Sequence, residues 1–164
     1  MQPSYSIKKL DNNDLGILKE LRLECLKNEP SSFRTRYTDE VAQSAQYWEQ
    51  VLRERIFFGL FIDKSNLAAI AFLTKDNENQ WFIGGVYTKP KFRGNGLMLQ
   101  LLRYMVDYFR SENLGNKIFL KVVWNNTAAV NTYNTLGFKI IKQLDHQLMG
   151  DNNYHIQYLM QLAT

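Results

Sequence analysis

The feature that most constrains the fold of this chain is a change of hydrophobic period near its middle. Three β-rich runs follow one another there, at Ile56–Asp63, Leu67–Lys75 and Gln80–Thr88. The short segments between them, Lys64–Asn66 and Asp76–Asn79, consist of residues that favour turns. This pattern is typical of an antiparallel meander, so the sequence predicts three consecutive, paired strands.

Four other segments repeat apolar residues every three or four positions, which is the spacing of one helical face. Two precede the meander and two follow it, at residues 15–29, 41–52, 97–114 and 127–136. Alternating or short apolar runs predict further strands at residues 4–9, 118–123, 139–149 and 154–162. The expected order is β-α-α-β-β-β-α-β-α-β-β, with no long linker and no repeat. We therefore expect one α/β domain over residues 1–164, in which four helices flank a mixed, mostly antiparallel central sheet.

The composition narrows the classes of function. Apolar residues make up 45% of the chain and charged residues 22%, as in an ordinary globular domain. The net charge of +4 suits an anionic ligand without requiring a nucleic acid, and no apolar run approaches the roughly 18 residues of a membrane span. Cys25 is the only cysteine and there are two histidines, so we expect no disulfide, no metal and a reducing, cytoplasmic location.

The stretch Val86–Leu97 carries the clearest chemistry. A strand runs into a basic loop with two glycines, Gly94 and Gly96, and the loop runs into a helix. Helix N-termini bind phosphates through unpaired N–H groups and a partial positive charge, and glycines let the backbone come close to such a ligand. The dinucleotide pattern G-x-G-x-x-G would require glycine where Leu99 stands, and the P-loop pattern is absent. On the glycines alone, the loop is either a phosphate site of another kind or only a tight turn.

Two motifs resemble those of the GNAT superfamily of N-acetyltransferases. Residues Arg93–Met98 fit the family's donor motif R/Q-x-x-G-x-G/A, with Met98 where Gly or Ala is usual. The second motif, N-x-x-A-x-x-x-Y-x-x-x-G-F, matches at every defined position, namely Asn126, Ala129, Tyr133, Gly137 and Phe138. The motifs occur in the family's order and separation, and the expected element order matches the family fold over nearly the whole chain.

This resemblance implies acetyl-CoA as the co-substrate and assigns roles to particular residues. The amides of Arg93–Met98 would hold the CoA pyrophosphate, the strand end at Val86–Thr88 would pair with the pantetheine arm, and Asn126 would contact the same arm. Tyr133 would protonate the departing thiolate. The expected donor-binding residues are thus Val86, Tyr87, Thr88, Arg93, Gly94, Asn95, Gly96, Leu97, Met98 and Asn126.

The residues themselves give independent support in the strand before the loop. Gly84 and Gly85 stand inside an otherwise good strand, and interior strand glycines often mark a bulge or a close backbone approach. A bulge there would splay the sheet and free backbone groups for a ligand. Without the motif, Tyr133 would be interpreted as a half-buried core tyrosine and Asn126 as a helix cap.

The general base and the acceptor are less constrained. Three acids, Glu24, Glu29 and Glu40, lie in the first helices and their loop, where the family usually builds its acceptor site. Glu40 ranks first as the base, and a water or a backbone carbonyl is an equal alternative. Aromatic and basic residues in the same region either belong to the core or wall an acceptor pocket, among them Phe33, Tyr37, Tyr47, Trp48, Arg34 and Arg36.

The leading hypothesis is direct attack by a primary amine on acetyl-CoA in a ternary complex, since no covalent relay residue stands out. The amine would belong to a small molecule or a peptide, and dimers are common in the family, so a homodimer is one option. The alternative function is a catalytically silent module that binds acyl-CoA. Binding of a nucleic acid or of a membrane is not expected.

Overall fold

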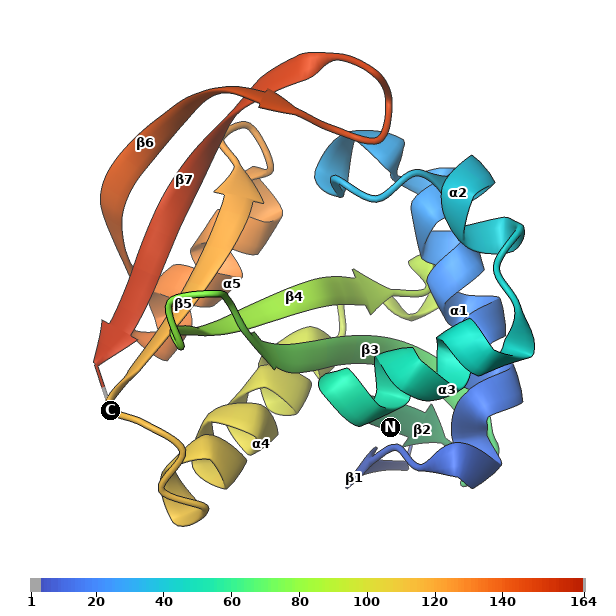
Figure 1. Ribbon diagram of the computed structural model, residues 1–164. Helices are drawn as coiled ribbons and strands as arrows, with labels where there is room; N and C mark the ends of the chain where they lie inside the picture. The colour runs from blue at the N-terminus through green and yellow to red at the C-terminus, as the bar shows by residue number, and fades with distance from the viewer. Residues whose placement is uncertain (1–3, 164) are drawn as a thin grey trace.

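A computed structural model describes residues 4–163, and one seven-stranded sheet runs through it in the order β1-β2-β3-β4-β5-β7-β6 (Figure 1). The strands are β1 (Tyr5–Lys9), β2 (Ile56–Ile62), β3 (Asn66–Lys75), β4 (Trp81–Thr88), β5 (Lys117–Val123), β6 (Lys139–Leu148) and β7 (Tyr154–Ala163). The helices are α1 (Leu15–Asn28), α2 (Tyr37–Val41), α3 (Ala45–Glu54), α4 (Leu97–Ser111) and α5 (Thr127–Leu136). No helix in this part of the chain is both long and apolar enough to cross a membrane.

The predicted meander is confirmed, because β2, β3 and β4 pair as antiparallel neighbours. Both faces of the meander are buried, which explains its near-continuous apolar sequence. Phe58 and Leu60 face the cluster that α4 completes with Leu101, whereas Phe57 faces the cluster that α1 completes with Leu18. The mixed α/β fold with a mostly antiparallel sheet is therefore as expected.

The second predicted helix, over residues 41–52, is two helices in the structure. Helix α2 ends at Val41, and α3 begins at Ala45 behind its own N-cap, Ser44, whose side chain accepts a hydrogen bond from the Tyr47 amide at 3.2 Å. The apolar spacing ran unbroken across this cap, so the periodicity alone joined two elements. The expected four flanking helices thus become five in the part of the chain that the structure describes.

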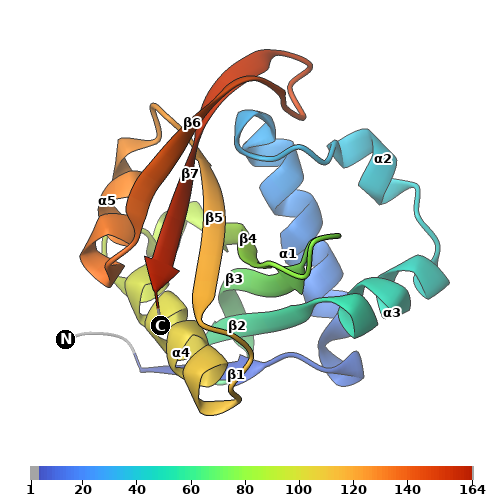
Figure 2. The same ribbon diagram turned by 60° about the vertical axis from the view of Figure 1, so that its left-hand side comes forward.

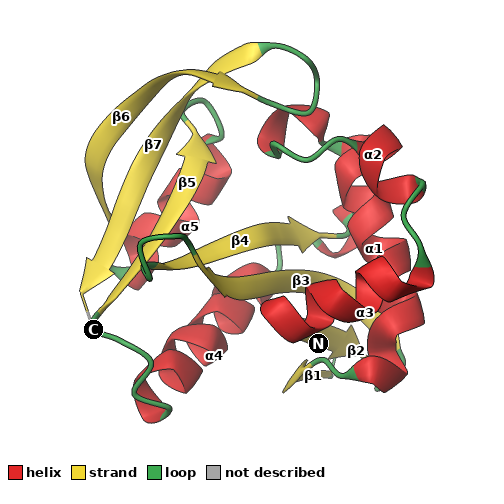
Figure 3. Cartoon of the chain, in the orientation of Figure 1, coloured by secondary structure: helices red, strands yellow, loops and turns green. Residues whose placement is uncertain are grey.

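The sheet opens between β4 and β5, the one parallel pair among the strands described. A single register pair, Phe82 with Phe119, joins them near the start of β4. Beyond it, the half of the sheet made of β5, β7 and β6 swings away from β4 (Figure 3). This opening is where the element order places the two sequence motifs, because the glycine loop follows β4 and helix α5 follows β5.

The predicted bulge lies in β4 beside this opening. Pairing with β3 steps from Ile70 opposite Tyr87 to Phe72 opposite Gly84, so β4 carries one extra residue. Gly85 has a φ of +61°, and a Cβ added there would lie 2.6 Å from the Phe72 ring. The interior glycines therefore do two things, since they permit the bulge and make room for an aromatic ring that lies on it.

The tip of the β6–β7 hairpin reaches across to the segment that follows α1 (Figure 2). The Gly150 amide donates to the Phe33 carbonyl at 2.6 Å, and the Arg36 guanidinium donates to the Asn152 side chain at 3.3 Å. A Cβ on Gly150 would lie 2.8 Å from the Thr35 carbonyl oxygen. Only glycine allows so close a backbone contact, so the hairpin tip and the α1–α2 segment form one continuous roof.

Candidate active site

Two cavities, each of about 520 Å³, meet in the opening of the sheet. The first, called the loop-side groove, lies between the glycine loop and α5. The second, the hairpin-side cavity, lies under the roof formed by the hairpin tip and the α1–α2 segment. Five residues line both cavities and form their common wall: Glu29, Val86, Asn126, Ala129 and Tyr133. Volumes of this size suit small molecules or parts of a cofactor.

Nine of the ten residues expected to bind a donor line the loop-side groove. The exception is Asn95, whose side-chain amide donates to the carbonyls of Phe92 and Arg93 at 3.2 and 3.4 Å. Asn95 therefore shapes the loop from within. The Met98 side chain is half-buried and packs against the core as well as bordering the groove, so a residue larger than Gly or Ala is accommodated at this position.

The glycine loop presents backbone to the groove. Gly94 and Gly96 have φ angles of +82° and +70°, a region that side-chain-bearing residues rarely adopt. A Cβ at either position would meet no atom within 4 Å, so the space beside both glycines is open. Gly96 is also the N-cap of α4, and no side chain caps this helix. The first-turn N–H groups of α4 are thus available to an anion such as a phosphate.

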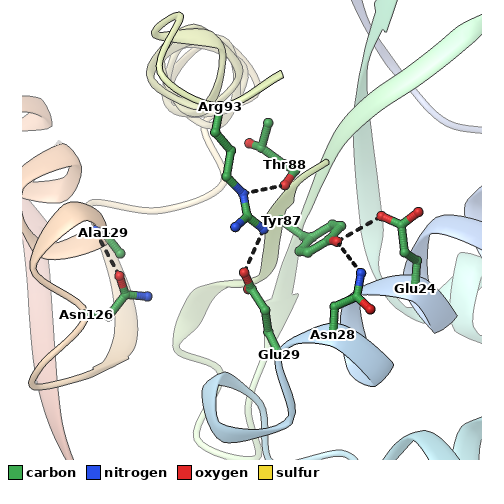
Figure 4. Close-up of polar contacts among 8 residues, drawn as sticks. All are labelled: Glu24, Asn28, Glu29, Tyr87, Thr88, Arg93, Asn126 and Ala129. Carbon is green, nitrogen blue, oxygen red and sulfur yellow. Dashed lines mark hydrogen bonds and ion pairs between the residues drawn. The ribbon is translucent and has the colours of Figure 1, made fainter. Parts of the chain in front are cut away.

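Arg93 fastens this loop to the rest of the protein (Figure 4). Its Nε donates to the Thr88 carbonyl at 2.8 Å, and its Nη2 pairs with Glu29 Oε1 at 2.6 Å. The guanidinium carbon also lies 5.3 Å from the centre of the Tyr87 ring. Arg93 therefore joins the end of β4, the glycine loop and the residue after α1, and it holds the Glu29 carboxylate at the common wall.

The Tyr87 side chain ties β4 to α1 (Figure 4). Its hydroxyl donates to Glu24 Oε2 at 2.8 Å and accepts from Asn28 Nδ2 at 3.2 Å. Burial, assisted by the Glu24 carboxylate, raises the pKa of Tyr87 to about 12. Because its hydroxyl is engaged in this way, Tyr87 offers the groove its backbone.

Helix α5 supplies two residues of the common wall. Asn126 is its N-cap, since the side-chain oxygen accepts from the Ala129 amide at 3.3 Å (Figure 4). Tyr133 is 6% exposed, and its hydroxyl makes no hydrogen bond with any residue in 4–163. Burial raises the pKa of Tyr133 well above the usual value of a tyrosine. Its hydroxyl therefore stays protonated near neutral pH, and it borders both cavities.

The hairpin-side cavity is strongly basic. Five cationic side chains line it, Arg22, Arg34, Arg55, Lys75 and Lys121, against two carboxylates, Glu29 and Asp76. Phe33, Phe72 and Phe82 supply aromatic walls. Phe33 and Arg34 thus lie where an acceptor pocket was anticipated, whereas Arg36 turns to Asp39 and Asn152.

Arg22 was not singled out from the sequence. It is 3% exposed. Its Nε lies 3.7 Å from the Glu40 carboxylate, too far for a hydrogen bond, and its Nη1 has no hydrogen-bond partner among residues 4–163. Leaving buried donors unsatisfied costs about 1–3 kcal/mol each, so their presence beside a cavity points to a ligand. A signal was available in the sequence, because Arg22 falls on the apolar face of α1 marked by Leu18, Leu21 and Cys25.

Sequence comparison agrees with this geometry. Residues 18–138 match the family described as Acetyltransferase (GNAT) family, which is well over half of the chain. The chain belongs to the GNAT acetyltransferase family. No curated protein is similar enough in sequence to count as a match.

Solved GNAT structures share the fold across their full lengths. A GNAT-family acetyltransferase from Streptococcus pneumoniae is 18% identical with a TM-score of 0.81, covering 98% of this chain and 100% of its own. An N-acetyltransferase from Staphylococcus aureus is 22% identical with a TM-score of 0.79, covering 98% and 97%. The yncA protein from Salmonella typhimurium, solved with its cofactor acetyl-CoA, is 17% identical with a TM-score of 0.80, covering 98% and 94%.

The acids of this GNAT chain are placed differently from one another. Glu40 lines neither cavity; it is buried, accepts from the Tyr47 hydroxyl at 2.7 Å and lies 3.7 Å from Arg22 Nε. Glu24 is bound to Tyr87, and Glu29 alone among the three borders both cavities. Glu40 as the base thus stays a prediction, and the geometry favours Glu29. Within residues 4–163, no three His, Cys, Asp or Glu side chains gather as a metal site would require.

Proposed function

We propose that this protein is an N-acetyltransferase that moves the acetyl group of acetyl-CoA to a primary amine by direct attack. The observation that carries the proposal is the common wall, where a groove shaped for an anionic cofactor meets a separate small-molecule cavity at Tyr133. Two substrates, one in each cavity, would bring their reacting groups together at these shared lining residues, which lowers the entropic cost of the reaction.

The residues of the loop-side groove fit coenzyme A. Open space beside Gly94 and Gly96, together with the uncapped N-terminus of α4, suits the pyrophosphate. The bulged end of β4 at Val86 offers backbone groups to the pantetheine amides. When bound, acetyl-CoA supplies an activated acetyl thioester. The structure of yncA with acetyl-CoA supports this choice of donor, because that protein shares the fold.

Tyr133 acts on the leaving sulfur in this proposal. Its pKa lies well above that of a thiol, so the hydroxyl keeps its proton and stabilises the departing thiolate by donating a hydrogen bond. The hydroxyl makes no hydrogen bond with any residue in 4–163, so it is available for that task. Glu29, held by Arg93, attracts the ammonium form of the acceptor and takes its proton, directly or through a water.

A covalent relay through the one cysteine does not fit the site. Cys25 is fully buried, lines neither cavity, and burial raises the pKa of its thiol to about 12. A thiol in that environment is inert as a nucleophile. We also propose that residues 1–164 act as one domain in the cytoplasm, because one sheet carries both cavity walls and the thiol is free.

The test pairs a melting experiment with an activity screen. Acetyl-CoA at 100 times its Kd should stabilise the protein by about 2.7 kcal/mol, and a panel of amines should release free thiol. Stabilisation without thiol release from any amine would instead support the silent acyl-CoA module. An unchanged melting temperature with both millimolar acetyl-CoA and millimolar CoA would refute donor binding altogether.

A further inference from the structure

The charge of the hairpin-side cavity is not balanced by its own acids. Glu29 is already paired with Arg93, and Asp76 Oδ1 accepts from the backbone amides of Glu78 and Gln80 at 2.9 Å each. Glu40, behind Arg22, also acts on Arg55, as does Glu54, so the five cationic side chains still outnumber the carboxylates near the cavity. Such a field favours an acceptor that carries negative charge in addition to its amine.

Two buried polar groups on the lining lack partners. Arg22 Nε and Nη1 and the Gln157 side-chain oxygen make no hydrogen bond within residues 4–163, although both residues are 3% exposed. Arg22 reaches the floor of the cavity beside the bulge, where a Cβ on Gly85 would lie 3.4 Å from Nη1. Guanidinium N–H groups match the paired oxygens of a carboxylate or a phosphate, and the carboxylate is the smaller of the two.

Arg55 approaches the same floor from the end of α3. Its guanidinium carbon lies 4.7 Å from the centre of the Phe72 ring, and that ring lies directly on Gly84 and Gly85. Burial, followed by the positive charge of Arg22, lowers the pKa of Arg55. The two guanidinium groups thus act on each other in a poorly solvated place. The Glu40 carboxylate offsets part of their charge, and a second anion at the cavity would offset more of it.

The bulge beside the two arginines is next to the common wall along β4. Gly85 precedes Val86, which lines both cavities. An acceptor whose carboxylate lies over the bulge would present its amine toward Val86, Glu29 and Tyr133. The roof limits its size, because the Gly150–Phe33 hydrogen bond closes the side opposite the floor with backbone.

We infer that the acceptor is a small amine that also carries a carboxylate, as an amino acid does, and that Arg22 and Arg55 bind this carboxylate. The inference rests on the proposed acetyltransferase function. It names the substrate class of the hairpin-side cavity and assigns the orientation of the amine to the two arginines.

The test compares matched amines that differ only at the carboxyl group. L-leucine and L-phenylalanine are each assayed with acetyl-CoA against their α-carboxamides, following thiol release. The expected kcat/KM for the acid exceeds that for the amide by about tenfold or more, the usual contribution of a charge-assisted hydrogen bond. The amide has the less basic amine, so intrinsic reactivity works against this preference. A short peptide with an N-terminal aspartate and a blocked C-terminus tests whether a side-chain carboxylate can take the place of the α-carboxylate of the acceptor.

Variants locate the effect. Arg55→Gln should reduce the ratio of kcat/KM for the acid to kcat/KM for the amide to about two or less. The double variant Arg22→Gln with Glu40→Gln should do the same, and it removes both buried charges together so that neither is left unpaired in the folded protein. Arg53→Gln is the control, since Arg53 is exposed on the same helix and lines neither cavity; it should keep the ratio.

A binding measurement separates the two levels of the proposal. Calorimetry of the CoA-loaded protein with N-acetyl-L-leucine and with its amide reports the carboxylate preference even if no amine turns over. Thiol release from none of the amines, together with tighter binding of the acid, would refute the enzymatic function and uphold the carboxylate site. Equal or better binding and turnover of the amides would overturn the carboxylate site and leave the acetyltransferase function standing.

Discussion

Replacing Tyr133 by Phe removes one hydroxyl from the wall that the two cavities share and keeps the ring that packs on Phe138. The side chain is 6% exposed and borders both cavities, and its hydroxyl makes no hydrogen bond with the rest of the described chain. The fold offers this hydroxyl no hydrogen-bond partner in exchange for the water it gives up, so its removal should leave the free energy of unfolding unchanged or raise it by up to about 1 kcal/mol. In a chain of 164 residues that is a rise of up to about 2–4 °C in Tm.

The same substitution should slow acetyl transfer. A general acid or hydrogen-bond donor contributes about 10²- to 10⁴-fold, and a thiolate leaves well, so the lower end is expected. A 10²-fold loss corresponds to about 2.7 kcal/mol of transition-state stabilisation. Because the hydroxyl acts only as charge develops on the sulfur, kcat should fall while the affinity for acetyl-CoA stays constant.

Two measurements on one protein sample test whether the Tyr133 hydroxyl acts in catalysis or only in the packing of the wall. Thermal unfolding with and without acetyl-CoA gives stability and donor affinity, and thiol release gives kcat. Tyr108→Phe is the matched control, because Tyr108 is partly buried against Phe58 and lines neither cavity. If the Tyr133→Phe protein unfolds at least 4 °C lower and turns over at the native rate, the hydroxyl is structural and does not donate to the leaving sulfur.

Three further perturbations test other parts of the structure. Gly96→Ala should lower the free energy of unfolding by about 1–2 kcal/mol, because position 96 has a positive φ, and it should also weaken CoA binding in titration calorimetry. Gly137→Ala is the control: its φ is +100° and it lines neither cavity, so it should lower stability without affecting CoA binding. Arg22→Met should lower the free energy of unfolding in urea by about 3–5 kcal/mol, because it strands the Glu40 carboxylate, and adding Glu40→Gln should restore most of the loss. Because the pKa of Tyr87 is raised to about 12 in the folded protein, its contribution to stability is complete below pH 10 and is lost as the pH rises toward 12. Tyr87→Phe should therefore reduce the fall of Tm between pH 10 and pH 12, and an unchanged slope would contradict this.

Much of the fold followed from local patterns. The meander, the helix from Leu97 and the bulge at Gly84–Gly85 were predictable because each depends on nearby residues: alternation, a helical face, or a glycine where a side chain would clash. The break between α2 and α3 was missed although Ser44 marked it, since the apolar period continued across a capped turn. At that point the N-cap residue determines where the helix begins, and the apolar spacing does not.

The acceptor side could not be derived in the same way. Nothing in the sequence distinguishes the roles of Glu24, Glu29 and Glu40. Only the tertiary structure directs Glu24 to Tyr87 and leaves Glu29 at the common wall. Arg22 of α1 and Arg55 at the end of α3 both line the hairpin-side cavity near the bulge in β4, although they lie far apart in the sequence. Contacts between distant segments of this kind are set by the tertiary structure and leave no spacing in the sequence.

The common wall also links the two binding equilibria. The same side chains, Tyr133 and Asn126 among them, form a boundary of both cavities, so a molecule on one side alters the surface that meets a molecule on the other. Thermodynamic linkage then makes the coupling reciprocal: the factor by which the donor tightens the acceptor is the factor by which the acceptor tightens the donor. In the proposed enzyme, the concentration of acceptor would therefore change the apparent affinity for the acetyl donor.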